Sequence, residues 1–104
     1  METRTLFATV KRNGRTAKVL GFYSLDEMPK VVLFDGQVIN LRMFADYIRK
    51  RPEDEAVVFG REDWYADFEI GADRTYSRVH FAIIRMGEQC LILDCSLNGT
   101  AIAD

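Results

Sequence analysis

Apolar and polar residues alternate with a period of two in several short stretches of the chain, the pattern expected of strands with one buried face. Turn-forming residues separate these stretches roughly every 8 to 12 residues, a spacing typical of β-sandwiches. Six strands are predicted on this basis, at 31–34, 37–39, 57–59, 68–70, 79–86 and 90–93.

The N-terminal residues 4–22 show the same alternation and are predicted to form a β-hairpin. Apolar residues recur at every second position on both sides of Asn13-Gly14. This dipeptide strongly favours a tight two-residue turn between antiparallel strands. The hairpin precedes the other predicted strands and is joined to them through 25–29.

One segment departs from the period of two. Between 41 and 50 the apolar residues recur at helical spacing and fall on one face. Asn40 is suited to cap a helix that begins here, and Pro52 is suited to end it. The expected fold is therefore an all-β antiparallel sandwich with one short helix inserted at about 41–50.

The composition is that of a single globular domain. The chain has 104 residues and a mass of 12.0 kDa, a size typical of one domain. This domain is expected to span 1–104, with a hairpin at 4–22 and a core at 31–104. The net charge of −2 and the pI near 5.4 give no sign of a surface for nucleic acid or membrane. Neither a bilayer-spanning apolar run nor a secretory signal is recognisable, so the protein is expected to be intracellular, nuclear or cytoplasmic.

The sequence favours neither a metal site nor a catalytic centre. Cys90 and Cys95 are expected to point to opposite faces of one strand and to stay reduced, and no four-ligand set with CxxC spacing accompanies them. Ser77, His80 and Asp94 are residue types of a hydrolase triad. On a strand, however, positions i and i+3 face opposite sides, and no GxSxG motif is present. We therefore expect His80 to be a buried structural histidine, and the chain to use no metal or cofactor and not to be an enzyme.

Hydrogen-bond donors recur at the ends of the predicted strands. Arg61 ends one strand, Ser77-Arg78 precedes the next, and the turn 98–100 follows the last. Guanidinium, hydroxyl and free backbone N–H groups all suit phosphate oxygens, and ten of the fourteen basic residues are Arg. These residues predict an anion site at one end of the sandwich, although Asn98-Gly99 would be expected as a hairpin turn in any all-β protein.

Three short motifs resemble those of the forkhead-associated (FHA) domain family, in which GR, SxxH and an NG turn follow one another in this order. Here they are Gly60-Arg61, Ser77 with His80, and Asn98-Gly99. The resemblance covers about residues 57–102. More loosely, residues 31–59 look like the FHA domain of fungal checkpoint kinases.

The resemblance implies an eleven-stranded β-sandwich that binds phosphothreonine in partner proteins through loops at one end. By position, Arg61 and Ser77 match the residues that hold the phosphate, and Arg78 matches a further phosphate contact. Contacts with the peptide are implied for Asn98 and for its neighbours in the binding loops, which are Thr75, Tyr76 and Leu97. Structural support of the site is implied for Gly60, His80 and Gly99.

The chain departs from the family after Thr100, because the family continues through several more strands. We expect the hairpin 4–22 to occupy the vacant strand positions; exchange of strands in a homodimer and a shortened chain are the alternatives. The expected function is a non-enzymatic phosphothreonine-binding module in signalling or the DNA-damage response. The alternative is a structural or oligomerisation protein that keeps an FHA-like scaffold, as a strand-exchanged dimer that does not bind phosphopeptides.

Overall fold

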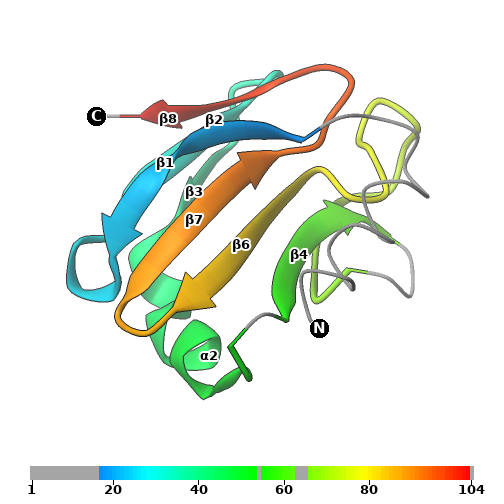
Figure 1. Cartoon of the computed structure of the whole chain (residues 1–104). Coiled ribbons are helices and arrows are strands. Elements are labelled where there is room, and N and C mark those ends of the chain that lie inside the picture. Colours follow the sequence, from blue (N-terminus) through cyan, green and yellow to red (C-terminus); the bar gives the residue numbers. More distant parts are fainter. Residues whose placement is uncertain (1–16, 54, 63–65, 104) are drawn as a thin grey trace.

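Two β-sheets make up most of the fold (Figure 1). The structure is a computed structural model that describes residues 17–53, 55–62 and 66–103. The larger sheet has the order β1-β7-β6-β4-β5 and the smaller one the order β3-β2-β8. The strands of the larger sheet are β1 (Lys18–Ser24), β4 (Ala56–Arg61), β5 (Phe68–Gly71), β6 (Phe81–Met86) and β7 (Gln89–Asp94). Those of the smaller sheet are β2 (Lys30–Leu33), β3 (Val38–Asn40) and β8 (Thr100–Ala103).

Three short helical segments connect the strands. A 3₁₀ turn, η1, spans Leu25–Glu27, and a second, η2 (Leu41–Phe44), runs directly into helix α2 (Ala45–Lys50). The Asn40 side chain caps η2 by accepting a hydrogen bond from the N–H of Arg42 at 3.2 Å. The inserted helix was thus predicted over the correct residues, but its first turn is 3₁₀ rather than α.

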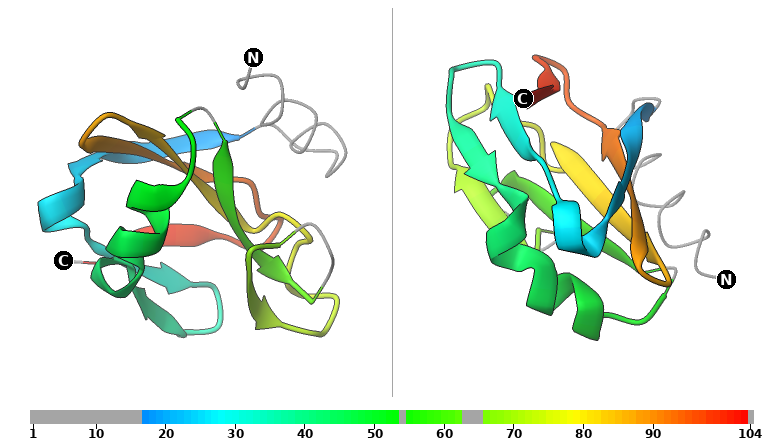
Figure 2. Two further views of the ribbon diagram at one scale, coloured as in Figure 1. Left: turned by 90° about the horizontal axis from the view of Figure 1, so that it is seen from below. Right: turned by 90° about the vertical axis from the view of Figure 1, so that its left-hand side faces the viewer.

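The main core lies between the two sheets, which Figure 2 shows as two layers with α2 at one side. The inward faces of β4, β6 and β7 meet the inward face of β2 and the apolar side of the helical segments. Phe59 and Phe81 stack at the centre with their ring planes 7° apart and their centroids 4.5 Å apart. Val31, Leu41 and Ile48 complete this core and are fully buried.

The central strands of the larger sheet are buried on both faces. The residues of β4 and β6 that point away from the main core form a second buried cluster with Leu93 and Cys95. This explains why the sequences AVVF and FAII are continuously apolar rather than alternating. Cys90 lies in the first cluster and Cys95 in the second, so the two thiols occupy opposite faces, as expected, and form no disulfide with each other.

The prediction of an all-β sandwich-like fold is confirmed, with two differences in connectivity. Strands β4 and β5 pair in parallel, although every other pair is antiparallel among the described strands. The segment with Asn98-Gly99 joins β7 of one sheet to β8 of the other. It is therefore a crossover between layers, and the expectation of a hairpin turn at this position is wrong.

Only the second half of the predicted N-terminal hairpin falls within the described residues. Strand β1 begins at Lys18 and ends at Ser24, two residues beyond the predicted end of the hairpin. It pairs antiparallel with β7 and forms the edge of the larger sheet in the described part of the chain. The first strand of the hairpin and the Asn13-Gly14 turn lie outside the described residues. In the described ranges, no helix has both the length and the apolar character needed to cross a bilayer.

Candidate functional site

Four segments meet at one end of the sandwich and are called the rim below. They are the β2–β3 turn (34–37), the end of β4 (60–61), the β5–β6 loop (72–80) and the β7–β8 crossover (95–99). Figure 1 shows the yellow β5–β6 loop and the orange crossover at the same end of the larger sheet. Side-chain and backbone hydrogen bonds join all four segments.

Ser77 connects the end of β4 to the β7–β8 crossover. Its carbonyl oxygen accepts the N–H of Arg61 at 2.9 Å, and its Oγ accepts the N–H of Leu97 at 3.0 Å. Because Oγ is used here as an acceptor, the hydroxyl proton is left to donate, and it has no acceptor among the described residues. Ser77 keeps 8% of its surface exposed, so this donor lies at the edge of the protein interior.

The exposed Asn98 side chain connects the crossover to the β5–β6 loop. Its Nδ2 donates to the carbonyl oxygen of Thr75 at 2.8 Å. Gly99 has a φ of +113°, which favours glycine, and its N–H donates to Ser96 Oγ at 2.9 Å. Ser96 Oγ in turn donates to Asp94 at 2.6 Å, so the crossover is held by its own side chains as well. Leu97, at its tip, is 66% exposed.

His80 bridges the β5–β6 loop and the crossover from inside the protein. Its Nδ1 accepts the N–H of Ser77 at 3.1 Å, and this requires Nε2 to carry the proton that faces the Gly99 carbonyl oxygen at 3.3 Å. The side chain is fully buried, and this burial lowers the pKa of His80 below its ordinary value of 6.5. The neutral ring is therefore the form that fits both contacts.

The geometric argument against a triad needs correction. Residues 77–80 lie in a bent loop before β6 and not on a strand, so Ser77 and His80 do approach each other. The ring contacts the Ser77 backbone N–H, however, while Ser77 Oγ contacts the Leu97 N–H. The hydroxyl and the imidazole are thus not arranged as a nucleophile and its base.

Gly60 permits the closest approach within the rim. A Cβ at this position would lie 1.8 Å from the carbonyl oxygen of Arg78 and 3.3 Å from that of Ser77. Both neighbours are backbone atoms. The loop that contains Ser77 and Arg78 can therefore lie against β4 only because residue 60 has no side chain.

The sequence did not reveal that the β2–β3 turn belongs to the rim. The Tyr76 hydroxyl donates to the Asp35 carboxylate, and the Phe34 and Tyr76 rings lie 5.3 Å apart. The hydrogen bond from Tyr76 lowers the pKa of Asp35, and that from Thr75 lowers the pKa of Asp73. The Asp-Gly pair at 35–36 indicated a turn, but nothing in it indicated a contact 41 residues away.

The rim carries charges of both signs. Asp35 and Asp73 are ionised, and each accepts a hydrogen bond from a hydroxyl of the β5–β6 loop. Arg61 is half-buried, and its guanidinium forms no ion pair with any described residue. Arg78 is exposed, one position after Ser77. Within the described ranges, no group of three or more His, Cys, Asp or Glu residues is arranged to hold a metal ion.

The structure brings all the residues proposed from sequence into this one region. Each of them lies in one of the four rim segments, which hydrogen bonds and the close approach at Gly60 hold together. The ten residues are Gly60, Arg61, Thr75, Tyr76, Ser77, Arg78, His80, Leu97, Asn98 and Gly99. Comparison of the chain with models of known protein families, with curated proteins and with solved structures finds no match.

Proposed function

We propose that this chain is a non-enzymatic module that uses the rim to bind phosphothreonine in partner proteins. The supporting observation is that two donors suited to phosphate are not used by the fold. These are the hydroxyl proton of Ser77 and the guanidinium of Arg61, neither of which has an acceptor among the described residues. The Arg61 N–H donates to the Ser77 carbonyl oxygen, so the two residues are adjacent across the rim.

The chemistry of a phosphate monoester matches this pair. A phosphothreonine carries about −1.5 to −2 charges and three acceptor oxygens near neutral pH. Arg61, at the end of β4, supplies a planar, permanently charged donor, and Arg78 is exposed in the β5–β6 loop, next to Ser77. Each charge-assisted hydrogen bond contributes about 1.5–3 kcal/mol, so the loss of one such donor should weaken binding roughly 10- to 100-fold.

The peptide around the phosphothreonine would lie over the exposed surface of the two loops. Leu97 offers an apolar contact, and the Asn98 amide and Thr75 offer polar groups at the junction of the loops. The threonine methyl group contributes about 0.8 kcal/mol if buried, so discrimination against phosphoserine should be about fourfold. The FHA resemblance of the motifs suggests a role in signalling or the DNA-damage response, in the nucleus or the cytoplasm.

The test is a titration of the protein with three peptides that differ only in bearing phosphothreonine, phosphoserine or threonine. The phosphothreonine peptide should bind best and the unmodified peptide at least tenfold more weakly. Arg61→Ala should abolish most of this difference. Lys50→Ala removes an exposed cation of α2 that lies outside the rim and should leave the difference between the peptides unchanged. Equal affinity for all three peptides would refute the proposal.

A second candidate is an oligomerisation protein that exchanges strands with a second copy. The observation in its favour is the position of β1 at the edge of the larger sheet, where it pairs only with β7 among the described strands. Val19 and Phe22 of this strand are 58% and 59% exposed. An exposed, apolar edge strand is suited to pairing with another chain. A stable dimer in light scattering whose mass does not respond to the peptides, and which binds none of them, would favour this candidate.

A further inference from the structure

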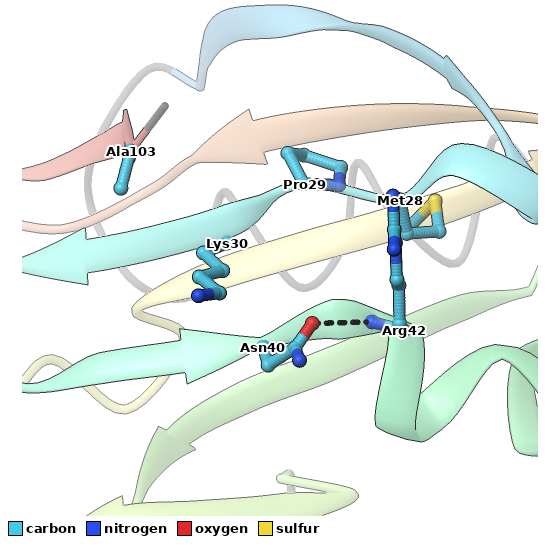
Figure 3. A pocket seen from close by; sticks show the side chains of 6 residues that line it. All are labelled: Met28, Pro29, Lys30, Asn40, Arg42 and Ala103. Carbon is cyan, nitrogen blue, oxygen red and sulfur yellow. Dashed lines mark hydrogen bonds between the residues drawn. The ribbon is translucent and has the colours of Figure 1, made fainter.

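A pocket of about 250 Å³ lies away from the rim, on the outer side of the smaller sheet (Figure 3). It is formed by the start of β2, the end of β3, the start of η2 and the end of β8. The described residues that line it are Met28, Pro29, Lys30, Asn40, Arg42 and Ala103. None of them was singled out as a site residue from the sequence.

The strand register places the polar lining residues next to one another. Lys30 of β2 is directly opposite Asn40 of β3 on one side and Ala103 of β8 on the other. Directly opposite residues in antiparallel pairs point to the same face. Because the next residue, Val31, is fully buried in the core, Lys30 and its two neighbours point away from it.

Three donors in this pocket are not used by the fold. Lys30 and Arg42 are exposed, and in the described part of the chain their cationic groups form no ion pair. The Asn40 oxygen accepts the N–H of Arg42, which leaves the Asn40 amide nitrogen as a donor without an acceptor among the described residues. Figure 3 shows this hydrogen bond from the Arg42 backbone N–H to the Asn40 side chain. Among residues 17–53, 55–62 and 66–103, no carboxylate lines the pocket.

Apolar residues form the remaining wall of the pocket. Pro29 and Ala103 present hydrocarbon surface to the same space, and Met28, which is 2% exposed, borders it from the main core. Pockets for drug-sized ligands usually measure about 300–1,000 Å³, so this one suits a smaller molecule or a single side chain. A ligand that satisfies both walls has an anionic end and a short apolar part.

We propose that this pocket binds a small organic anion, in which a carboxylate or phosphate group contacts Lys30, Asn40 and Arg42 and an apolar group contacts Met28 and Pro29. The pocket is separate from the rim. Lys30 starts β2, whereas the rim turn follows Leu33 at the other end of that strand. Four residues of strand correspond to about 10–13 Å. The proposal is therefore independent of phosphothreonine binding.

The test uses amide NMR spectra of the whole chain during titration with acetate, butyrate and inorganic phosphate. Sodium chloride at matched ionic strength is the control. We expect saturable shifts of the amide signals of Lys30, Asn40, Arg42 and Ala103 with acetate or phosphate. Whichever of these two anions binds more tightly shows whether the pocket prefers a carboxylate or a phosphate group. Butyrate has two more CH₂ groups than acetate. It should bind at least threefold more tightly than acetate, because each buried CH₂ adds to the affinity.

Two double variants with equal charge changes locate the site. In Lys30→Gln with Arg42→Gln, binding at the pocket should weaken at least tenfold. The double variant Arg61→Gln/Arg78→Gln removes two charges at the rim, and the affinity of the pocket for the anion should change less than twofold in it. The proposal is overturned if chloride produces the same shifts, if the pocket shifts persist in the first variant, or if acetate and butyrate bind equally.

Discussion

The tight packing at Gly60 makes a quantitative prediction for Gly60→Ala. The added Cβ would lie 1.8 Å from the carbonyl oxygen of Arg78, and an ordinary contact begins at 3.4 Å. The loop must therefore move by about 1.6 Å, because β4 is held between β5 and β6 and has less freedom to shift. Such a movement separates the Ser77 carbonyl oxygen from the Arg61 N–H, which it accepts at 2.9 Å.

The expected cost combines two contributions. Overpacking of a well-packed site typically costs about 1–3 kcal/mol. The loss of one backbone hydrogen bond adds about 1 kcal/mol. A total of about 2–4 kcal/mol leaves most of the protein folded, since domains are stable by about 5–15 kcal/mol. The rim should nevertheless lose its arrangement, so phosphothreonine affinity should fall together with stability.

Urea unfolding of Gly60→Ala and of Gly87→Ala measures this effect. Gly87 has a φ of +67° and open space around it, so an alanine there causes backbone strain but no steric clash. We expect the free energy of unfolding to fall by about 1 kcal/mol in Gly87→Ala and by at least twice as much in Gly60→Ala. Hydrogen exchange at the Arg61 amide should accelerate only in Gly60→Ala. Equal losses of stability in the two variants would show that the close approach at Gly60 is unimportant.

Three further predictions concern the bonds that hold the rim and the adjacent strands. Burial lowers the pKa of His80, so below its ordinary value of 6.5 the unfolded chain binds more protons than the folded one, and stability falls as the pH falls. The free energy of unfolding should therefore decrease less between about pH 7.5 and about pH 5.5 in His80→Gln than in the wild type, and equal slopes would contradict this. Asn98→Ala should cost only about 1 kcal/mol in urea unfolding but reduce phosphothreonine affinity at least tenfold, and a change below twofold would contradict the assignment. Asp67→Ala removes the carboxylate that accepts from Arg51 at 2.9 Å and from the Val58 N–H at 2.8 Å, and should cost about 2–3 kcal/mol in the same assay. Glu55→Ala, which removes a more exposed partner of Arg51, should cost less than about 1 kcal/mol, and equal losses would refute the distinction.

The fold class was predictable from sequence because its determinants are local. Alternation, turn residues and one helical segment located most of the strands within a few residues of their observed ends. The position of the helical segment formed by η2 and α2 followed from its apolar spacing and from Asn40, whose capping bond to η2 spans two residues. Signals of this kind depend on the backbone and its nearest neighbours, so they can be read without the tertiary structure.

The details of the rim could not be predicted because they depend on contacts between distant residues. The bond from Tyr76 to Asp35 spans 41 residues, and neither residue carries a local signal for it. The approach of Ser77 to His80 was misjudged because the loop was treated as part of a strand. The pocket at Lys30 was missed for a similar reason, since it requires the register of three strands to be known.

A clear physical criterion separates a binding rim from a rim that only closes the sandwich. A structural role requires only the bonds that join the loops, such as those from Asn98 to Thr75 and from Leu97 to Ser77. Donors that the fold leaves unused add no hydrogen bond that stabilises the folded state. The Arg61 guanidinium and the Ser77 hydroxyl proton are such donors in the described part of the chain. The proposed function therefore requires that an anionic ligand accept from both of these donors, which the backbone bond between Arg61 and Ser77 places on neighbouring segments.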